Sequence, residues 1–161
     1  MPNRSTAIDS TSTRESAATV MSEQALAQAC ATLMYEKDSA SRSLGIELTS
    51  IAPGQAVMTM TVKAWMLNGV NTCHGGFIFS LADSCFAFAC NSRNQIYVAQ
   101  SVNIDYLSPG LLGEILTASA VELKAGGMTG LYDVNVTAPS GKVVAYFRGK
   151  SHRIKGQHIA E

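Results

Sequence analysis

The sequence predicts an α+β domain in which a curved antiparallel sheet is wrapped around one long central helix. The first observation behind this fold class is that residues 64–92 carry a single formal charge, Asp83. A helix that is apolar on every side is buried on every side. The second observation is that four long β-forming segments follow with only short turns between them, which is typical of an antiparallel sheet. A sheet that encloses the helix satisfies both observations.

The first predicted element begins at Ser22, whose hydroxyl can cap a helix. The apolar residues that follow recur with the i, i+4, i+7, i+8 spacing of one helix face: Leu26, Cys30, Leu33 and Met34. This spacing predicts an amphipathic helix that ends near Gly45.

Six segments are predicted to be strands, because they are rich in β-forming residues and are bounded by turns that contain Gly or Pro. These strands are expected at residues 46–51, 56–62, 97–107, 115–123, 129–137 and 143–154. The central helix is expected at residues 75–91, after a loop at residues 67–74.

The composition is that of one domain that hides part of its surface. The 161 residues include 12 basic and 12 acidic side chains, with 47% hydrophobic and 15% charged residues. A chain of this length can bury a core as a single domain. Zero net charge argues against attraction of the whole molecule to nucleic acid or to an anionic membrane. So few charges on so apolar a chain predict contacts with other copies, and we expect a homo-oligomer.

The two ends of the chain are predicted to lie outside this domain. Eight of the first twenty residues are Ser or Thr, so residues 1–20 are expected to be a disordered tail and not a secretory signal. The domain is expected over residues 21–155, with a C-terminal tail at residues 156–161. The most apolar run, residues 75–89, is too short to span a membrane and contains Asp83.

The four cysteines and three histidines show no metal-site spacing. We therefore expect no metal and no organic cofactor. Cys85 and Cys90 lie in the apolar run, where a free thiol behaves as a small hydrophobic group. Reduced, buried thiols indicate a cytoplasmic protein. Cys73 beside His74 does not indicate a thiol nucleophile, because adjacent residues rarely present a usable Cys–His pair.

The central helix begins at His74, Gly75 and Gly76. Two glycines allow a backbone or a ligand to approach closely. The free N–H groups at a helix N-terminus form a ready site for an anion or an oxyanion. The alternative is that the glycines only relieve crowding where the helix meets the sheet.

Asp83 is the only acid in this helix. An isolated buried carboxylate is costly, so it normally has a partner or a function. Two explanations stay open at this point. Asp83 is either catalytic, or it is a structural residue whose hydrogen bonds to Ser80 or Ser84 lock the core.

The spacing of Gly75 and Asp83 constrains how they can act together. They are eight residues apart, which is about 12 Å along a helix. One reacting carbonyl cannot lie within about 3 Å of both in the same subunit. If the two residues share a site, two helices must lie side by side in opposite directions, so that Gly75 of one subunit meets Asp83 of the other. Catalysis would then require a dimer.

The run from Asn68 to Asp83 resembles the N-G-x-x-x-x-H-G-G-x-x-x-x-L-x-D motif of hotdog-fold acyl-CoA thioesterases. Residues 103–110 and the ending Phe-Arg-Gly-Lys-Ser-His-Arg-Ile at residues 147–154 also fit this family. The similarity runs from residue 26 to residue 154 and points to the phenylacetyl-CoA thioesterases of phenylacetate degradation. The resemblance implies a hotdog fold and hydrolysis of an aryl-acyl-CoA, such as phenylacetyl-CoA or its hydroxylated forms, to the free acid and CoA.

The resemblance also implies roles for individual residues. Asp83 would act on the thioester carbonyl, directly as a nucleophile or through water as a base. Gly75 would donate its backbone N–H to the carbonyl oxygen. His74 and Asn68 would orient the thioester or the attacking water. Some distant relatives place a hydroxyl one turn after the acid, where this chain has Ala87.

Binding of the CoA portion is expected at basic and loop residues. Residues 142–161 hold five basic side chains and one acidic side chain, whereas residues 1–141 hold seven basic and eleven acidic side chains. The C-terminal strand is thus a natural partner for phosphates, although a solvated strand edge explains its lysines equally well. The resemblance adds two loops at the CoA entrance. The expected CoA-binding residues are Ser108, Pro109, Lys124, Gly126, Gly127, Arg148 and Lys150.

These observations lead to one principal hypothesis and two alternatives. The principal one is an acyl-CoA thioesterase whose catalytic unit is a dimer, expected within a tetramer. The alternatives are a hotdog enoyl-CoA hydratase and a non-catalytic acyl-CoA-binding protein. The acyl group is expected near Phe77, Phe86 or Phe88, although such rings are more often part of a core.

Overall fold

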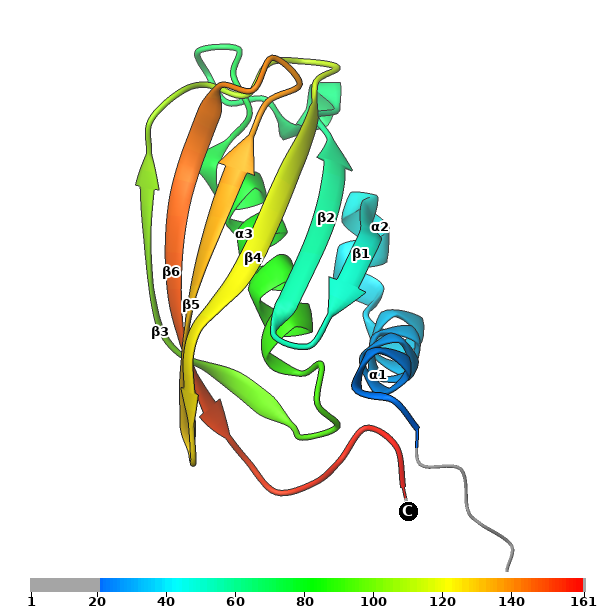
Figure 1. The fold of residues 1–161 in the computed structure, drawn as a ribbon. Helices are drawn as coiled ribbons and strands as arrows, with labels where there is room; N and C mark the ends of the chain where they lie inside the picture. The colour runs from blue at the N-terminus through cyan, green and yellow to red at the C-terminus, as the bar shows by residue number, and fades with distance from the viewer. Residues whose placement is uncertain (1–20, 161) are drawn as a thin grey trace, which may run out of the picture.

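Helix α3, Gly75–Cys90, is the apolar element around which residues 21–160 are arranged in this computed structural model. Residues 1–20, where the N-terminal tail is predicted, lie outside the described residues, as does residue 161. The sheet curves around α3, and two shorter helices flank strand β1 (Figure 1). The sequence therefore predicted the architecture correctly: a curved antiparallel sheet around a central helix.

The sheet has six strands in the order β1-β2-β4-β5-β6-β3, and every neighbouring pair is antiparallel. Its strands are β1 Ile46–Ala52, β2 Gln55–Thr61, β3 Tyr97–Tyr106, β4 Ile115–Gly126, β5 Thr129–Thr137 and β6 Val143–Arg153. A 3-10 turn, η1, spans Ala64–Met66 between β2 and the loop before α3. Strand β4 runs three residues beyond its predicted end at residue 123, because the hairpin to β5 turns only at Gly127 and Met128, where Gly127 has φ 59°.

The first predicted helix is broken into two at Asp38. Helix α1 spans Glu23–Lys37 and α2 spans Ser39–Leu44, which ends at Gly45 as predicted. The break has a local cause, because Asp38 ends α1 and its carboxylate caps α2 by accepting a hydrogen bond from the Ser41 N–H at 3.0 Å. The predicted cap at Ser22 is confirmed, since its hydroxyl accepts from the Ala25 N–H at 3.2 Å.

The core lies between α3 and the concave face of the sheet. Phe86 and Phe88 are each 1% exposed, so they belong to this core. The ring of Phe86 packs against Phe147 and Tyr132 at centroid distances of 5.8 and 5.5 Å. Gly149 makes room for it, because a Cβ there would lie 2.8 Å from the Phe86 ring. Phe77 is only half-buried and packs at right angles to Trp65.

Strand β3 is an edge of the sheet, hydrogen-bonded to β6 on one side only. Eight of its ten residues are exposed, with only Tyr97 and Ile104 half-buried. A long edge strand with unpaired backbone groups is a template for pairing with another chain. It lies on the same side of the molecule as the start of α3, which its last residue, Tyr106, contacts.

Candidate active site

Helix α3 begins with an imidazole cap. His74 has extended backbone angles, φ −61° and ψ 133°, and its Nδ1 accepts a hydrogen bond from the Gly76 N–H at 3.0 Å. Nδ1 therefore carries no proton in this arrangement, and the proton of the neutral ring sits on Nε2. The N–H of Gly75 has no acceptor among residues 21–160. One backbone donor is thus free at the positive end of the helix dipole.

Gly75 is covered by Tyr106 from the end of strand β3. The Tyr106 hydroxyl donates to the Gly75 carbonyl oxygen at 2.9 Å. A Cβ at position 75 would lie 3.1 Å from the Tyr106 ring, so only glycine accepts this contact without a shift. Nothing in the sequence marks Tyr106 as a site residue, because the pairing of β3 with β6 that brings its ring to the helix start has no signal along the chain.

Asn68 holds the loop before α3 in shape. Its side-chain oxygen accepts from the N–H groups of Val70 and Thr72 at 3.0 and 3.1 Å, and its amide donates to the Thr72 hydroxyl at 2.9 Å. Asn71 closes the turn with a positive φ of 61°. The amide oxygen of Asn68 therefore has its two hydrogen bonds within the loop, and one amide hydrogen stays free.

A pocket of about 430 Å³ joins four of the predicted site residues. Asn68 and Gly75 lie on its helix side, and Ser108 and Pro109 come from the loop after β3. The remaining lining residues are Thr72, Cys73, Ile78, Tyr106 and Leu107. The start of α3 and the predicted entrance loop therefore face one space.

Asp83 is half-buried and has no hydrogen bond or ion pair among the described residues. The two serines that were its candidate partners are engaged elsewhere. Ser80 donates to the Gly76 carbonyl at 2.8 Å, and Ser84 shares a 2.8 Å hydrogen bond with Ser41 of α2. Burial raises the pKa of the Asp83 carboxyl. The hydrogen bonds to Ser80 or Ser84 that a structural role for Asp83 would require are therefore not formed.

Gly75 and Asp83 belong to one continuous helix, so they are not brought together within the chain. Eight residues of helix separate them by about 12 Å. The pocket beside Gly75 does not include Asp83. A site that contains both groups therefore needs a second copy of α3.

The predicted CoA-binding residues do not share one pocket. Arg148 and Lys150 point outward from β6, while Phe147 and Gly149 point toward α3. Arg148 forms a bidentate ion pair with Asp133, with N–O distances of 2.6 and 2.7 Å. Lys150 shares a pocket of about 210 Å³ with Lys124 and Gly126.

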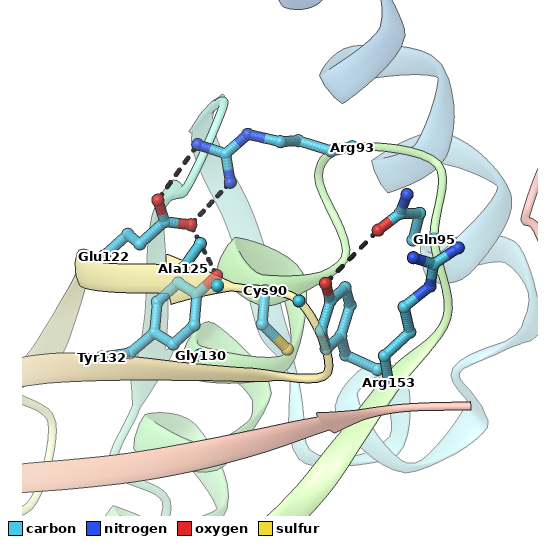
Figure 2. Close-up of a pocket in the computed structure, with 11 residues that line it drawn as sticks. Cys90, Arg93, Gln95, Glu122, Ala125, Gly130, Tyr132 and Arg153 are labelled. Carbon is cyan, nitrogen blue, oxygen red and sulfur yellow. Dashed lines mark hydrogen bonds and ion pairs between the residues drawn. The ribbon is translucent and has the colours of Figure 1, made fainter.

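Another cavity lies at the C-terminal end of α3, where Cys90 and Arg153 line it (Figure 2). Gly126 and Gly127 belong to the same lining. Its volume is about 460 Å³. Burial raises the pKa of the Cys90 thiol to about 12, so this side chain is a neutral part of the wall.

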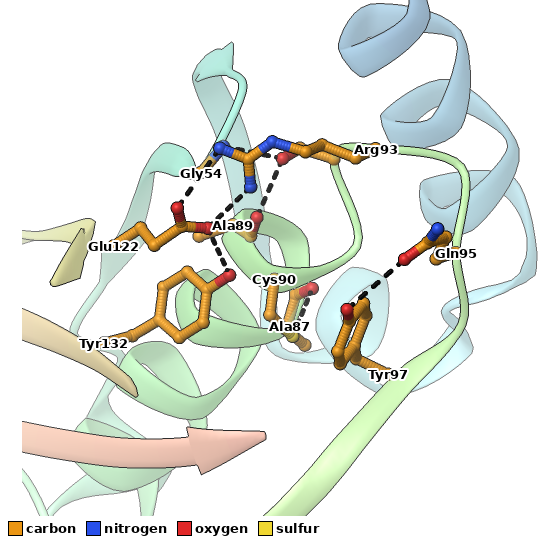
Figure 3. A network of polar contacts seen from close by, with 10 residues as sticks. Gly54, Ala87, Ala89, Cys90, Arg93, Gln95, Tyr97, Glu122 and Tyr132 are labelled. Atoms are coloured by element: carbon orange, nitrogen blue, oxygen red, sulfur yellow. Dashed lines mark hydrogen bonds and ion pairs between the residues drawn. The ribbon is translucent and has the colours of Figure 1, made fainter. Parts of the chain in front are cut away.

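One wall of this cavity is a polar network that the sequence did not predict (Figure 3). The Glu122 carboxylate accepts from both terminal nitrogens of Arg93, at 2.6 and 3.2 Å, and from the Tyr132 hydroxyl at 2.7 Å. Burial alone would raise the pKa of Glu122, but these hydrogen bonds lower it below its ordinary value. The three residues come from a loop and two strands, so only the folded chain brings them together.

Comparison with known proteins decides the family. The family described as "Thioesterase superfamily" matches residues 70–145, which include the start of α3 and Asp83. The acyl-coenzyme A thioesterase PaaI of Escherichia coli (strain K12) is 51% identical over 128 residues, covering 80% of this chain and 91% of that protein.

The chain belongs to the thioesterase superfamily.

Solved structures agree with this assignment to the thioesterase superfamily. The E. coli PaaI protein from the phenylacetic acid degradation operon matches with a TM-score of 0.83 and 49% identity, covering 84% of this chain and 99% of that one. The smu.793 protein from Streptococcus mutans, bound to acetyl CoA, matches with a TM-score of 0.67 and 27% identity, covering 70% and 90%. The predicted hotdog fold is confirmed, and the chain is a thioester hydrolase.

Two kinds of feature are absent from residues 21–160. No helix in this range has the length and apolar character to cross a membrane. Nor do these residues contain a group of three or more His, Cys, Asp or Glu side chains that could hold a metal ion.

Proposed function

We propose that this thioesterase hydrolyses an aryl-acyl-CoA, such as phenylacetyl-CoA or its hydroxylated forms, to the free acid and CoA at a site built from two subunits. The observation that carries the proposal is the half-buried, unpartnered carboxylate of Asp83 on the same helix as the free Gly75 N–H. An acid and an oxyanion donor are the two groups that thioester hydrolysis requires.

The catalytic cycle follows from these two groups. The thioester oxygen accepts a hydrogen bond from the Gly75 N–H of one subunit, which stabilises the negative charge that develops on it. Asp83 of the other subunit then attacks the carbonyl carbon, or removes a proton from an attacking water. If Asp83 attacks, the C–S bond breaks to give the CoA thiolate and a mixed anhydride with Asp83, and a water molecule then hydrolyses the anhydride to the free acid and supplies the proton for the thiolate. If Asp83 acts as a base, the water adds to the carbonyl carbon, the C–S bond breaks, and the proton held by Asp83 passes to the departing thiolate. A raised pKa makes Asp83 a stronger base than an exposed aspartate.

His74 and Asn68 complete the donor side of the proposed site. His74 keeps its Nε2 proton because Nδ1 is occupied by the Gly76 N–H, so the ring presents a donor and not a base. Asn68 has one free amide hydrogen beside the pocket at Gly75. Both side chains are thus suited to orient the thioester or water.

The free edge of β3 supports a dimer with antiparallel α3 helices. Pairing of two β3 strands would join the sheets, and the exposed backbone of β3 is available for it. The reversal of one α3 relative to the other then places the helix start of each subunit beside the acid of its partner. We include a tetramer built from two such dimers in the proposal, and a cytoplasmic location, where the four buried free thiols would stay reduced.

For CoA, the proposal relies first on Lys124 and Lys150, which line one pocket with Gly126 and have no ion-pair partner among the described residues. Arg148 already forms an ion pair with the Asp133 carboxylate, so its contribution to phosphate binding is expected to be smaller than that of the two lysines. Ser108 and Pro109 border the pocket at Gly75, where the pantetheine arm would approach the thioester. The acetyl CoA bound to the S. mutans relative supports CoA as the ligand. The operon of the E. coli relative supports the aryl-acyl group.

A panel of acyl-CoA substrates tests the proposal. Release of free thiol is measured for phenylacetyl, hydroxyphenylacetyl, straight-chain and enoyl thioesters, with wild type and with Asp83→Asn. We expect the aryl thioesters to be the best substrates, and we expect Asp83→Asn to lower kcat by at least a hundredfold. Glu47→Gln, which removes an exposed acid on β1, is the matched control. Hydration of the enoyl thioester without thiol release, or binding without any reaction, would replace the proposal with one of the two alternatives.

A further inference from the structure

The peptide group between Gly75 and Gly76 is held at both of its ends. His74 Nδ1 accepts a hydrogen bond from the Gly76 N–H at 3.0 Å, and the Tyr106 hydroxyl donates to the Gly75 carbonyl oxygen at 2.9 Å. The Tyr106 ring also packs against Gly75, at 3.1 Å from where a Cβ would stand. Two side chains from different elements thus fix one peptide plane at the start of α3.

This clamp matters because of the residue that it fixes. Glycine has no Cβ to restrict φ and ψ, so a glycine at the first position of a helix can turn its own N–H away from the pocket at little cost. The Gly75 N–H is the donor that lies free at this position. This N–H belongs to the peptide group between His74 and Gly75. Its direction is therefore set by the φ and ψ angles of Gly75, which relate this group to the clamped group between Gly75 and Gly76.

We propose that Tyr106 is a positioning residue for the reaction: its hydroxyl and ring hold Gly75 so that the backbone N–H points at the thioester oxygen. Tyr106 reaches this position from the last residue of the edge strand β3, and it lines the same pocket as Gly75. It needs no contact with the reacting atoms. The inference rests on the proposed function, because it assumes that the Gly75 N–H serves the thioester.

The chemistry of the tyrosine suits this role. Although Tyr106 is an exposed residue, partial desolvation of its side chain raises the pKa of the hydroxyl, so the group stays protonated and remains a donor at neutral pH. Because the Tyr106 hydroxyl donates to the Gly75 carbonyl oxygen, it does not occupy the neighbouring N–H groups, which stay available to the substrate. A carboxylate or amide oxygen at the same place would compete for those N–H groups.

The test compares Tyr106→Phe, which keeps the ring and removes the hydroxyl, with Tyr146→Phe. Tyr146 is an exposed tyrosine of β6 whose hydroxyl makes no hydrogen bond within residues 21–160, so it is a matched control. We expect Tyr106→Phe to lower kcat by about tenfold, the effect of one hydrogen bond, with KM within twofold of wild type. The oligomeric state should be unchanged, the free energy of unfolding should fall by no more than about 1 kcal/mol for the one lost hydrogen bond, and Tyr146→Phe should behave like wild type.

A double-mutant cycle separates positioning from simple support of the fold. Gly75→Ala places a Cβ 3.1 Å from the Tyr106 ring, so the ring must shift and its hydrogen bond to the Gly75 carbonyl is weakened in that variant. Adding Tyr106→Phe to Gly75→Ala should then cost little more, because coupled residues are not additive. Additive losses, or a Tyr106→Phe kcat within twofold of wild type, would overturn the inference. If Asp83→Asn is also fully active, the proposed function fails; if Asp83→Asn is inactive, only the role of Tyr106 fails.

Discussion

The Nδ1 atom of His74 accepts the Gly76 N–H at 3.0 Å, so this imidazole is the N-cap of the helix that carries Asp83. The same ring is expected to donate from Nε2 to the thioester or to water. These two roles can be separated by substitution, since an asparagine can cap a helix but does not reproduce the Nε2 donor.

We expect His74→Ala to lose both roles and His74→Asn to lose only one. Loss of the cap in His74→Ala should lower the free energy of unfolding by about 1 kcal/mol. His74→Asn should keep the wild-type stability, and both variants should show a lower kcat. Chemical denaturation and steady-state kinetics on the same preparations measure the two effects. Wild-type kcat in His74→Asn would show that the ring serves only as a cap.

Gly75→Pro removes the backbone N–H that is proposed to bind the thioester oxygen. Proline is well accepted at the first position of a helix, and the ψ of 133° at His74 suits a residue before proline. Gly75→Ala keeps the N–H but places a similar Cβ against Tyr106, so it is the matched control. We expect kcat in Gly75→Pro to be about a hundredfold or more below that of Gly75→Ala, as for loss of an oxyanion donor. Equal rates for the two variants would exclude the Gly75 N–H as this donor.

The raised pKa of Asp83 predicts opposite effects of pH on stability and on activity. The folded protein binds the Asp83 proton more tightly than the unfolded chain, so the carboxylate costs stability once the pH has risen through the folded-state pKa. Asp83→Asn should therefore unfold at a higher temperature than wild type at neutral pH, and the difference should shrink in acid. Activity should fall as the pH drops through this same raised pKa. Thermal unfolding of both proteins at several pH values tests this prediction. A lower unfolding temperature for Asp83→Asn than for wild type at neutral pH would contradict it.

Binding of the CoA phosphates should depend on the pocket that Lys124 and Lys150 share. The double variant Lys124→Gln/Lys150→Gln is expected to raise KM by about tenfold, since each exposed ionic contact is worth up to about 1 kcal/mol. Its KM should also respond less to added salt than that of wild type. Lys37→Gln/Lys142→Gln removes the same charge from other elements and serves as control. Equal changes in the two double variants would indicate a general effect of net charge.

Much of the fold was accessible from local patterns, and the exceptions have local or long-range causes. The apolar run with its single charge predicted α3, and the turns predicted the six strands, because burial and turn chemistry act over a few residues. The break at Asp38 was missed because one carboxylate caps a second helix where the apolar stripe continues. Arg148 is held in an ion pair, whereas Lys124 lines a pocket. This difference depends on the side chains of neighbouring strands, which local patterns do not reveal.

The candidate site shows the same division. Asp83 and Gly75 stand out in the sequence because each is chemically unusual at its position. Tyr106 does not, since a tyrosine at the end of a strand is ordinary until β3 is placed beside the start of α3. Arg93, Glu122 and Tyr132 meet through three separate segments, so no spacing along the chain predicts their network.

The central claim is that each active site takes Gly75 from one subunit and Asp83 from the other, and mixed dimers test it most directly. Asp83→Asn and Gly75→Pro chains carrying different affinity tags are mixed, and the heterodimer is purified through both tags. Each parent is inactive alone, but the heterodimer has one site with both groups intact and one with neither. The account predicts that this heterodimer regains half of the wild-type activity per dimer. A verified heterodimer as inactive as its parents would contradict a shared site.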